Sequence, residues 1–274
     1  MRRLVENSLT KDGKHSLFSR SNLASGNGPQ PQKTPSALRK KLSAFTYLTG
    51  EELDRIDALE QRPRTIQAGR EFICSDHHDQ RAYILNKGWV YTYKLLADGS
   101  RQVLSFHLPG DFIALNRVVL RTWNRGAVAL TDIEVCEIQP RDITDVLHTQ
   151  PKLATAILWA LSRDTAIAEE HLVDLGRRSA LVRTAHFLIE LGARLRLVGL
   201  ASEDGYHCPI NQSLLADALG ISAIHLNRIL RQLREKGCLT FRQGYVSLDN
   251  PQRLMSLAQY DGGYLDQDIE PALV

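Results

Sequence analysis

The spacing of apolar residues within residues 211–237 predicts two short helices joined by a tight turn. Asn211 is a suitable N-cap for the first helix, and Gly220 stands where a residue in the left-handed conformation commonly ends one. Ser222 is a suitable N-cap for the second helix, which we expect to end at Gly237. Three leucines give the first helix one apolar side: Leu214, Leu215 and Leu219.

The second of these helices separates its apolar side chains from most of its polar ones. At about 100° per residue, four apolar residues fall on one face: Leu226, Ile229, Leu230 and Leu233. The opposite face carries Ile224, Arg228 and Arg231, flanked by His225 and Asn227. Two helices around a glycine turn, the second with a basic outer face, are typical of a DNA-binding helix-turn-helix. The alternative is a helical hairpin without that role.

Residues 64–138 alternate short β-prone runs with turn sequences. The runs include REFIC, QVLSFHL and IEVCEI, and breaks such as SDHHDQ and LPGD separate them. The dipeptide Asp98–Gly99 favours a hairpin because both residues tolerate positive φ. Several short strands at about ten-residue spacing predict a small antiparallel β-barrel or roll.

A helical pattern returns from Arg141, and Pro151 suits the first turn of a second, longer helix. We expect Gly176 to end that helix and to act as a hinge before a further helix over residues 177–195. Apolar and small residues on the longer helix have the alternating spacing of a coiled-coil seam, which favours a homodimer over packing on the chain's own β-roll. The seam is Ala154, Leu158, Leu161, Thr165, Ala168, Leu172 and Leu175.

Two short strands around Gln243–Gly244 follow the helix pair and make the region a winged helix-turn-helix. Arg242 and Gln243 at the tip of the wing are placed to contact DNA phosphates. The sequence ASEDGYHCP of residues 201–209 is interpreted as a polar loop. The fold class is therefore α+β, with an N-terminal antiparallel β-roll, a long dimerisation helix and a C-terminal winged helix-turn-helix.

At 274 residues the chain exceeds an average domain, which favours several parts. The net charge of +3 is small, but basic residues are concentrated near the start of the chain and acidic residues near its end. The sparse apolar content of the first residues predicts a disordered basic arm. The expected parts are the arm (1–38), a β-roll sensor (39–148), a dimerisation helix (149–176), the winged helix-turn-helix (177–258) and an acidic tail (259–274).

The chain has four cysteines: Cys74, Cys136, Cys208 and Cys238. They are far apart and none forms a CxxC pair, so the sequence has no local signature of a zinc site or an iron–sulfur cluster. Such scattered cysteines fit a reducing cytosol. No apolar run reaches the roughly 18 residues of a membrane span, and no secretory signal is visible, so we expect a cytoplasmic protein. Cys74, His77 and His78 are metal-ligand types, but neighbouring histidines splay apart on extended chain, and no metal site is expected.

The order of β-roll, long helix and winged helix-turn-helix resembles the Crp/Fnr superfamily of bacterial transcription regulators. Four stretches carry the resemblance: LPGDFIAL, NRGAVALTDIEVCEI, LGRRSALVRTAHFLIEL and LADALGISAIHLNRILRQLREKGCLTF. It covers roughly residues 42–258. The resemblance implies a cyclic-nucleotide-binding-like sensor, a homodimer on double-stranded DNA, and contact with RNA polymerase if the protein is an activator.

The resemblance also implies an effector pocket, formed by Gly110, Asp111, Leu115, Arg125, Gly126 and Ala127. Members that bind cyclic AMP use a Glu for the ribose and an Arg for the phosphate. Here Arg125 stands at the Arg position, but Leu115 stands where the Glu should be, and Gly126 replaces the usual Ser. The Thr-Ser pair that touches adenine is missing near Ile167 and Ala168. We therefore expect neither cyclic AMP nor another cofactor, and the arm has no clustered cysteines for an Fnr-type iron–sulfur site.

The resemblance further indicates how the second helix reads DNA. Arg228 matches a base-reading arginine, which bonds to guanine O6 and N7. Ala223 and Ile224 stand where the family commonly has Arg and Glu, so the half-site should differ from the usual one. The other candidates are His225 and Asn227 for bases or phosphates, and Gln212, Ser222 and Arg231 for phosphates. Two subunits would read inverted half-sites about one turn apart.

A second hypothesis from another class is a small-molecule-binding module whose C-terminal domain docks on a protein partner. The basic residues between Arg228 and Arg242 argue against it. Enzymatic activity is not expected, because no nucleophile–base pair, paired catalytic carboxylates or phosphate-binding loop stands out from the fold pattern.

Overall fold

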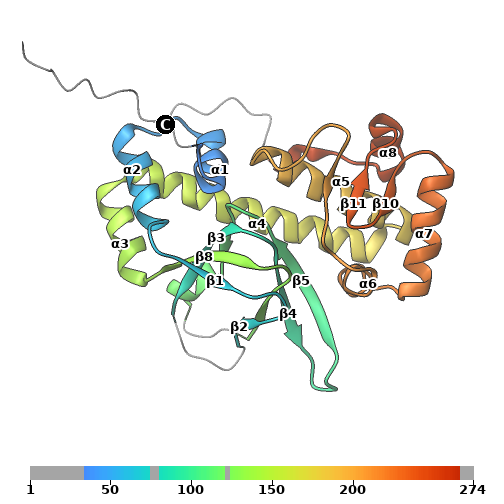
Figure 1. Cartoon of the computed structure of the whole chain (residues 1–274), viewed down its shortest axis with the longest axis horizontal. Helices are drawn as coiled ribbons and strands as arrows, with labels where there is room; N and C mark the ends of the chain where they lie inside the picture. The colour runs from blue at the N-terminus through green and yellow to red at the C-terminus, as the bar shows by residue number, and fades with distance from the viewer. Residues whose placement is uncertain (1–33, 75–79, 121–123, 266–274) are drawn as a thin grey trace, which may run out of the picture. The chain divides into compact units, whose positions relative to one another are not determined.

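The predicted β-region forms two four-stranded antiparallel sheets (Figure 1). The structure is a computed structural model that describes residues 34–74, 80–120 and 124–265. One sheet has the order β1-β8-β3-β6: Pro63–Ile66, Ile133–Ile138, Ala82–Lys87 and Phe112–Ile113. The other has the order β2-β7-β4-β5: Glu71–Ile73, Gly126–Ala129, Val90–Leu95 and Arg101–His107. The predicted antiparallel β-roll is confirmed.

The hairpin between β4 and β5 turns at Asp98–Gly99, as predicted. Gly99 has a φ of +82°, and the Asp98 carboxylate accepts a hydrogen bond from the Ser100 backbone N–H at 2.9 Å. On β5, the Gln102 side-chain amide donates to the backbone oxygen of Asp217 at 3.1 Å. This hairpin therefore contacts the C-terminal region directly.

Among the described residues, two helices precede the sheets: α1 (Ala37–Phe45) and α2 (Gly50–Leu59). Thr49 and Glu52 form a reciprocal capping box at the start of α2. The arm boundary at residue 38 is wrong, because Ser36 caps α1 and Leu38 is fully buried. The prediction of a disordered arm otherwise falls on residues 1–33, which lie outside the described residues.

The predicted long helix is present as α4 (Pro151–Arg177), and it follows α3 (Pro140–Thr149). The prediction that Gly176 ends this helix is wrong, because Gly176 lies within α4. The break comes at Arg178, whose backbone is extended, and at Ser179. The Ser179 hydroxyl accepts from the Val182 backbone N–H and so caps the next helix, α5 (Ala180–Leu197).

The C-terminal region contains α6 (Gln212–Leu219), α7 (Ala223–Glu235) and α8 (Pro251–Ala258). The wing is a sheet with the order β10-β11-β9: Thr240–Arg242, Tyr245–Ser247 and Gly205–His207. The interpretation of residues 201–209 as a loop is thus wrong where β9 forms. Tyr206 explains the strand, since its ring is buried and its hydroxyl donates to the Leu188 backbone oxygen at 2.5 Å.

After α8 the chain turns back as a 3-10 helix, η2 (Gly262–Leu265), which packs against α4. Leu265 is only 1% exposed. The first part of the predicted acidic tail (259–274) is therefore docked on the protein through apolar and aromatic side chains. The remaining tail, 266–274, lies outside the described residues.

One apolar cluster joins the β-roll to the C-terminal region. Phe106 of β5, Phe187 of α5 and Leu219 of α6 all belong to it. The Phe106 and Phe187 rings have centroids 5.9 Å apart in an edge-to-face arrangement. Because the core is shared, a change in the β-roll has a direct packing path to the helix-turn-helix.

Candidate DNA-binding interface and sensor cavity

The turn between α6 and α7 has the cap chemistry that the sequence predicts. The Asn211 side-chain oxygen accepts from the Leu214 backbone N–H at 2.9 Å. Gly220 has φ 62° and ψ 38°, the left-handed conformation that closes α6. The Ser222 hydroxyl accepts from the His225 backbone N–H at 3.2 Å and starts α7. Ser222 therefore holds the helix end, with its hydroxyl already engaged.

The two faces of α7 differ in exposure. The inward face is buried, as predicted: Leu226, Ile229, Leu230 and Leu233. The outward face carries exposed Arg228 and Ile224, and Ile224 is 77% exposed although it is a large aliphatic residue. His225 and Asn227 beside them are also exposed, and Ala223 is half-buried. The outer face thus combines a cation, polar groups and an apolar group in one accessible surface.

The two outward arginines of α7 are in different situations. Arg231 donates from Nε to Glu235 at 2.7 Å, one turn further along the helix. For Arg228, no side-chain hydrogen bond or ion pair is formed within the described part of the chain. Arg228 is therefore ready to meet an external acceptor, whereas Arg231 must share its charge with Glu235.

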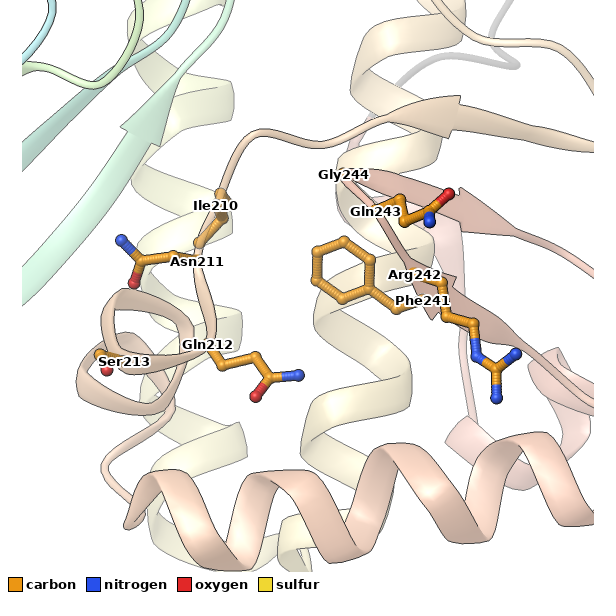
Figure 2. Close-up of a pocket in the computed structure, with 8 residues that line it drawn as sticks. All are labelled: Ile210, Asn211, Gln212, Ser213, Phe241, Arg242, Gln243 and Gly244. Carbon is orange, nitrogen blue, oxygen red and sulfur yellow. The ribbon is translucent and has the colours of Figure 1, made fainter.

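The start of α6 and the tip of the wing line an open hollow of about 810 Å³ (Figure 2). The Gln212 side chain extends from one side of the hollow and Arg242 from the wing side. At the wing tip, Gln243 and Gly244 both have positive φ, 51° and 73°, which makes the reversal tight. The structure thus brings the predicted phosphate-contacting residues of α6 and the wing to one hollow.

A second cavity, of about 650 Å³, lies where β5, α4, α5 and α6 meet. Leu115 and Arg125 of the predicted effector pocket line it, and so do Ile167 and Ala168 of α4. His107 also lines the wall, and burial lowers its pKa to about 4, so its ring is neutral near pH 7. The cavity touches both the β-roll and the winged domain.

The other four predicted effector-pocket residues do not line this cavity. A Cβ at Gly110 would lie 2.8 Å from the Ala37 backbone oxygen, and a Cβ at Gly126 would overlap the Tyr93 ring. Ala127 is fully buried in β7. Asp111 has buried cationic partners instead.

Asp111 lies in an ion network that joins three parts of the chain. Its carboxylate accepts from Lys41 Nζ of α1 at 2.7 Å and from the Arg194 guanidinium of α5 at 3.0 Å. It also accepts from the Leu108 backbone N–H at 2.8 Å. Burial by itself raises the pKa of Asp111, but Lys41 and Arg194 hold that pKa well below its ordinary value. Asp111 is thus an ionised structural group.

Glu190 of α5 continues the network and is fully buried. Its carboxylate is hydrogen-bonded to His171 Nε2 of α4 at 2.9 Å, to the Tyr264 hydroxyl of η2 at 3.0 Å and to the Arg194 guanidinium at 3.4 Å. Burial by itself raises the pKa of Glu190, but His171 and Arg194 lower it overall. For His171, burial by itself lowers the pKa, and the Glu190 carboxylate raises it above the ordinary value. Each member of the pair therefore favours the charged form of the other.

Sequence patterns did not single out this network. Glu190 and Arg194 are charged residues four apart on the otherwise apolar side of a helix, and this was the available signal. Their partners lie far away in sequence, 83 residues for Asp111 and 74 for Tyr264. Pattern reasoning within one helix does not reach such pairs.

The predicted seam on α4 contains a stripe of exposed leucines. Leu158 is 63% exposed and Leu172 is 69% exposed, and Leu175 is also exposed. Thr165 and Ala168 between them are exposed, whereas Ala154 and Leu161 are half-buried. The other side of α4 is buried against the chain itself: Leu153, Ala156, Ile157, Trp159, Ala160 and Ile167. Both sides of the helix are therefore apolar, which is expected of a helix with a second partner.

No group of three His, Cys, Asp or Glu side chains in the described ranges is arranged to hold a metal ion. His77 and His78 lie outside those ranges, and Cys74 within them is half-buried. Cys136, Cys208 and Cys238 are buried free thiols. Across the described ranges, no helix has the length and apolar character to cross a membrane.

A β-roll joined through a long helix to a winged helix-turn-helix defines a class of sensor-linked DNA-binding regulators. The profile of the Cyclic nucleotide-binding domain matches residues 63–150, and that of the Crp-like helix-turn-helix domain matches residues 182–257. The chain belongs to the Crp/Fnr superfamily, and it is a DNA-binding transcription regulator that acts as a homodimer.

Three relatives support this assignment. The nitrogen fixation regulation protein FixK of Bradyrhizobium diazoefficiens is 34% identical over 177 residues, which are 64% of this chain and 73% of that protein. The fumarate and nitrate reduction regulatory protein of Vibrio cholerae is 26% identical over 211 residues, 77% of this chain and 84% of that protein. The solved structure of FixK2 from Bradyrhizobium japonicum has a TM-score of 0.65 at 28% identity, and the match covers 73% of this chain and 98% of that chain.

Proposed function

We propose that the outer face of α7 reads base edges in the major groove and that Gln212, Arg242 and Gln243 bind the flanking phosphates. The observation that carries this proposal is the exposed Arg228, whose guanidinium has the five donors needed to bond guanine O6 and N7. The buried inner face fixes α7 on the domain, so the outer face is held in one orientation. Ser222 supports α7 as its N-cap.

The half-site is proposed to contain a thymine contacted by Ile224. Ile224 is highly exposed, and an aliphatic side chain at the groove floor favours the thymine C5-methyl group. The Ala223 side chain has no hydrogen-bonding group, so one guanine contact expected of the family is missing. His225 and Asn227 remain candidates for polar base or phosphate contacts.

The sensor is proposed to work without cyclic AMP. Leu115, Ile167 and Ala168 line the cavity with aliphatic groups where ribose and adenine would need polar partners. The Tyr93 ring fills the space next to Gly126, and Tyr93 donates to Glu71 at 2.7 Å. A buried polar ligand group without a partner costs about 1–3 kcal/mol, so several such losses weigh heavily against this nucleotide.

The exposed stripe on α4 is proposed as the dimer interface. Leu158, Leu172 and Leu175 provide unpaired apolar surface in coiled-coil spacing. We further propose a non-enzymatic role in the cytoplasm, with RNA polymerase as a partner if the protein activates transcription; the transcription regulators among its relatives support this.

Selection of binding sites from random double-stranded DNA by the full-length protein tests this function. We expect enrichment of an inverted repeat whose half-site differs from the usual family sequence. Recovery of sequences without a common motif would overturn the proposal. A melting screen of the same protein with cyclic AMP should show no shift, and a clear rise in Tm would overturn the proposal for the sensor.

A further inference from the structure

The segment after α8 contacts the dimer helix through a buried polar group. We name residues 260–265 the C-terminal clasp. The backbone oxygen of Leu265 accepts a hydrogen bond from Arg163 Nε of α4 at 2.7 Å. Arg163 is almost fully buried, and its guanidinium lies over the Trp159 ring at 5.8 Å. The clasp is therefore attached to α4 by Arg163, a side chain that is itself buried.

The clasp also contacts α5, the first helix of the DNA-binding region. The Tyr264 hydroxyl donates to the buried Glu190 carboxylate at 3.0 Å. The Tyr264 ring stacks on His186 with centroids 5.8 Å apart and planes 17° apart, and the Tyr260 ring lies 5.0 Å from the same imidazole. His186 is completely buried, so both tyrosines cover a side chain of α5.

The contacts of the clasp lie on both sides of the break between α4 and α5. His186 approaches Asp174 at 3.3 Å and Glu170 at 3.5 Å, both on α4. Arg178, at the break itself, pairs with Glu170 at 2.6 Å and with Asp174 at 2.8 Å. A clasp bonded to Arg163 on one helix and Glu190 on the other ties the two helices together across this break.

We propose that the C-terminal clasp is a positioning element that fixes the DNA-binding region on the dimer helix, and so sets the half-site spacing that the dimer accepts. The matched helix-turn-helix profile ends at residue 257, so the clasp lies beyond the part that defines the family. In a dimer joined along α4, the orientation of α5 on α4 determines the separation of the two α7 helices. The inference rests on the proposed roles of the α4 seam and α7.

The test compares variants on three DNA duplexes: the selected inverted repeat, the same repeat with two base pairs inserted between half-sites, and a single half-site. The variants are Tyr264→Ala, Tyr264→Phe, Arg163→Gln and a chain ending at Asp261. A chain ending at Gln267 is the matched control, because it shortens the terminus and keeps the clasp. Melting curves check that each variant folds.

Wild type and the Gln267 control should bind the repeat with the correct spacing about tenfold or more tightly than the repeat with the insertion. A tenfold ratio corresponds to about 1.4 kcal/mol of binding free energy. Tyr264→Ala, Arg163→Gln and the chain ending at Asp261 should lose most of this preference and keep their half-site affinity. Tyr264→Phe keeps the aromatic ring and should therefore retain part of the spacing preference. Unchanged spacing preference in the clasp variants would overturn the proposal, as would an equal loss of half-site affinity, which indicates general destabilisation.

Hydrogen exchange without DNA separates this inference from the proposed function. Amides of residues 176–182 should exchange faster in the clasp variants than in wild type and the Gln267 control. Unchanged exchange there would overturn the clasp proposal even if the protein binds DNA as expected. If wild type fails to bind any inverted repeat, the DNA-reading proposal fails, and the exchange result still decides whether the clasp holds the two helices.

Discussion

The Arg194 guanidinium of α5 donates a hydrogen bond to the Asp111 carboxylate in the loop between β5 and β6, over 3.0 Å. The same guanidinium donates to the Phe106 backbone oxygen at 2.8 Å. Both contacts are buried, and they join the sensor to the first helix of the DNA-binding region. Any rearrangement of the β5–β6 loop must therefore break or carry with it a charged contact to α5.

Asp111→Ala should strongly destabilise the protein. The change leaves Lys41 and Arg194 buried without their shared carboxylate, and breaking a buried ion pair costs about 3–5 kcal/mol. Urea denaturation measures the loss. The matched control is Asp57→Ala, which removes a partly exposed pair with Arg39 and should cost about 1 kcal/mol or less. Similar losses in the two variants would contradict the role given to Asp111.

Arg228→Ala should weaken specific DNA binding by about 1–3 kcal/mol and relax selectivity at one guanine. The reason is the loss of two hydrogen bonds to a single base edge. Fluorescence anisotropy on the selected site and on each single-base variant of it gives both effects. Arg234→Ala is the control, because Arg234 is exposed on the same helix but about 120° around it from Arg228. An equal loss on random DNA would show that Arg228 binds phosphate and not a base.

Leu172→Glu should convert the dimer to monomer and abolish tight binding to the inverted repeat. Leu172 is exposed in the protomer, so the charge does not disturb the protomer's own core, but it meets the partner helix in the seam. Sedimentation velocity at micromolar concentration measures the association. Leu96→Glu places the same charge on an exposed leucine near the β4–β5 turn and should leave the dimer intact. A dimeric Leu172→Glu protein would refute the seam as interface.

The pair of His171 and Glu190 should make stability depend on pH. The folded pKa of His171 is raised above 6.5, so its contribution is complete below about pH 6.5 and is lost as pH rises through the raised pKa. The folded pKa of Glu190 is lowered below 4.5, so its contribution is complete above about pH 4.5 and is lost as pH falls through the lowered pKa. The two contributions overlap between these values.

His171→Gln should therefore flatten the fall in unfolding free energy between pH 6 and pH 8. Asp174 and Arg194 also act on the His171 imidazole, so they must stay unchanged in the comparison. Urea titrations of wild type and variant at the two pH values test this. Identical pH slopes in the two proteins would show that His171 does not titrate with folding.

The helix-turn-helix was predictable because its signals are local. Asn211, Gly220 and Ser222 each act within a few residues, and the apolar spacing of α7 directly gives its buried face. The strand β9 was missed because the contact that anchors Tyr206, a hydrogen bond from its hydroxyl to the Leu188 backbone oxygen of α5, lies outside the local pattern. A local sequence pattern indicates only the structure that a segment favours by itself. The strand β9 depends on packing against a segment outside that pattern.

The sensor site was only partly predictable. The resemblance placed Leu115 and Arg125 on the cavity wall, but it transferred positions along the chain and not the surroundings of side chains. Asp111 was assigned to the effector pocket, although its carboxylate is already bonded to Lys41 and Arg194. The end of α4 was misplaced for a related reason: a glycine is permitted to end a helix, but α4 continues through Gly176 to Arg177, and Ser179 caps the start of α5.

The central claim is that two copies of the chain, joined along α4, read two inverted half-sites through α7. The most direct measurement is the mass of the complex in sedimentation equilibrium on the selected duplex, together with its affinity when one half-site is scrambled. We predict two protomers per duplex and a loss of about a hundredfold or more when one half-site is destroyed, as expected when both halves contribute to one dimer's binding. One protomer per duplex, or an affinity unchanged by scrambling, would contradict the claim.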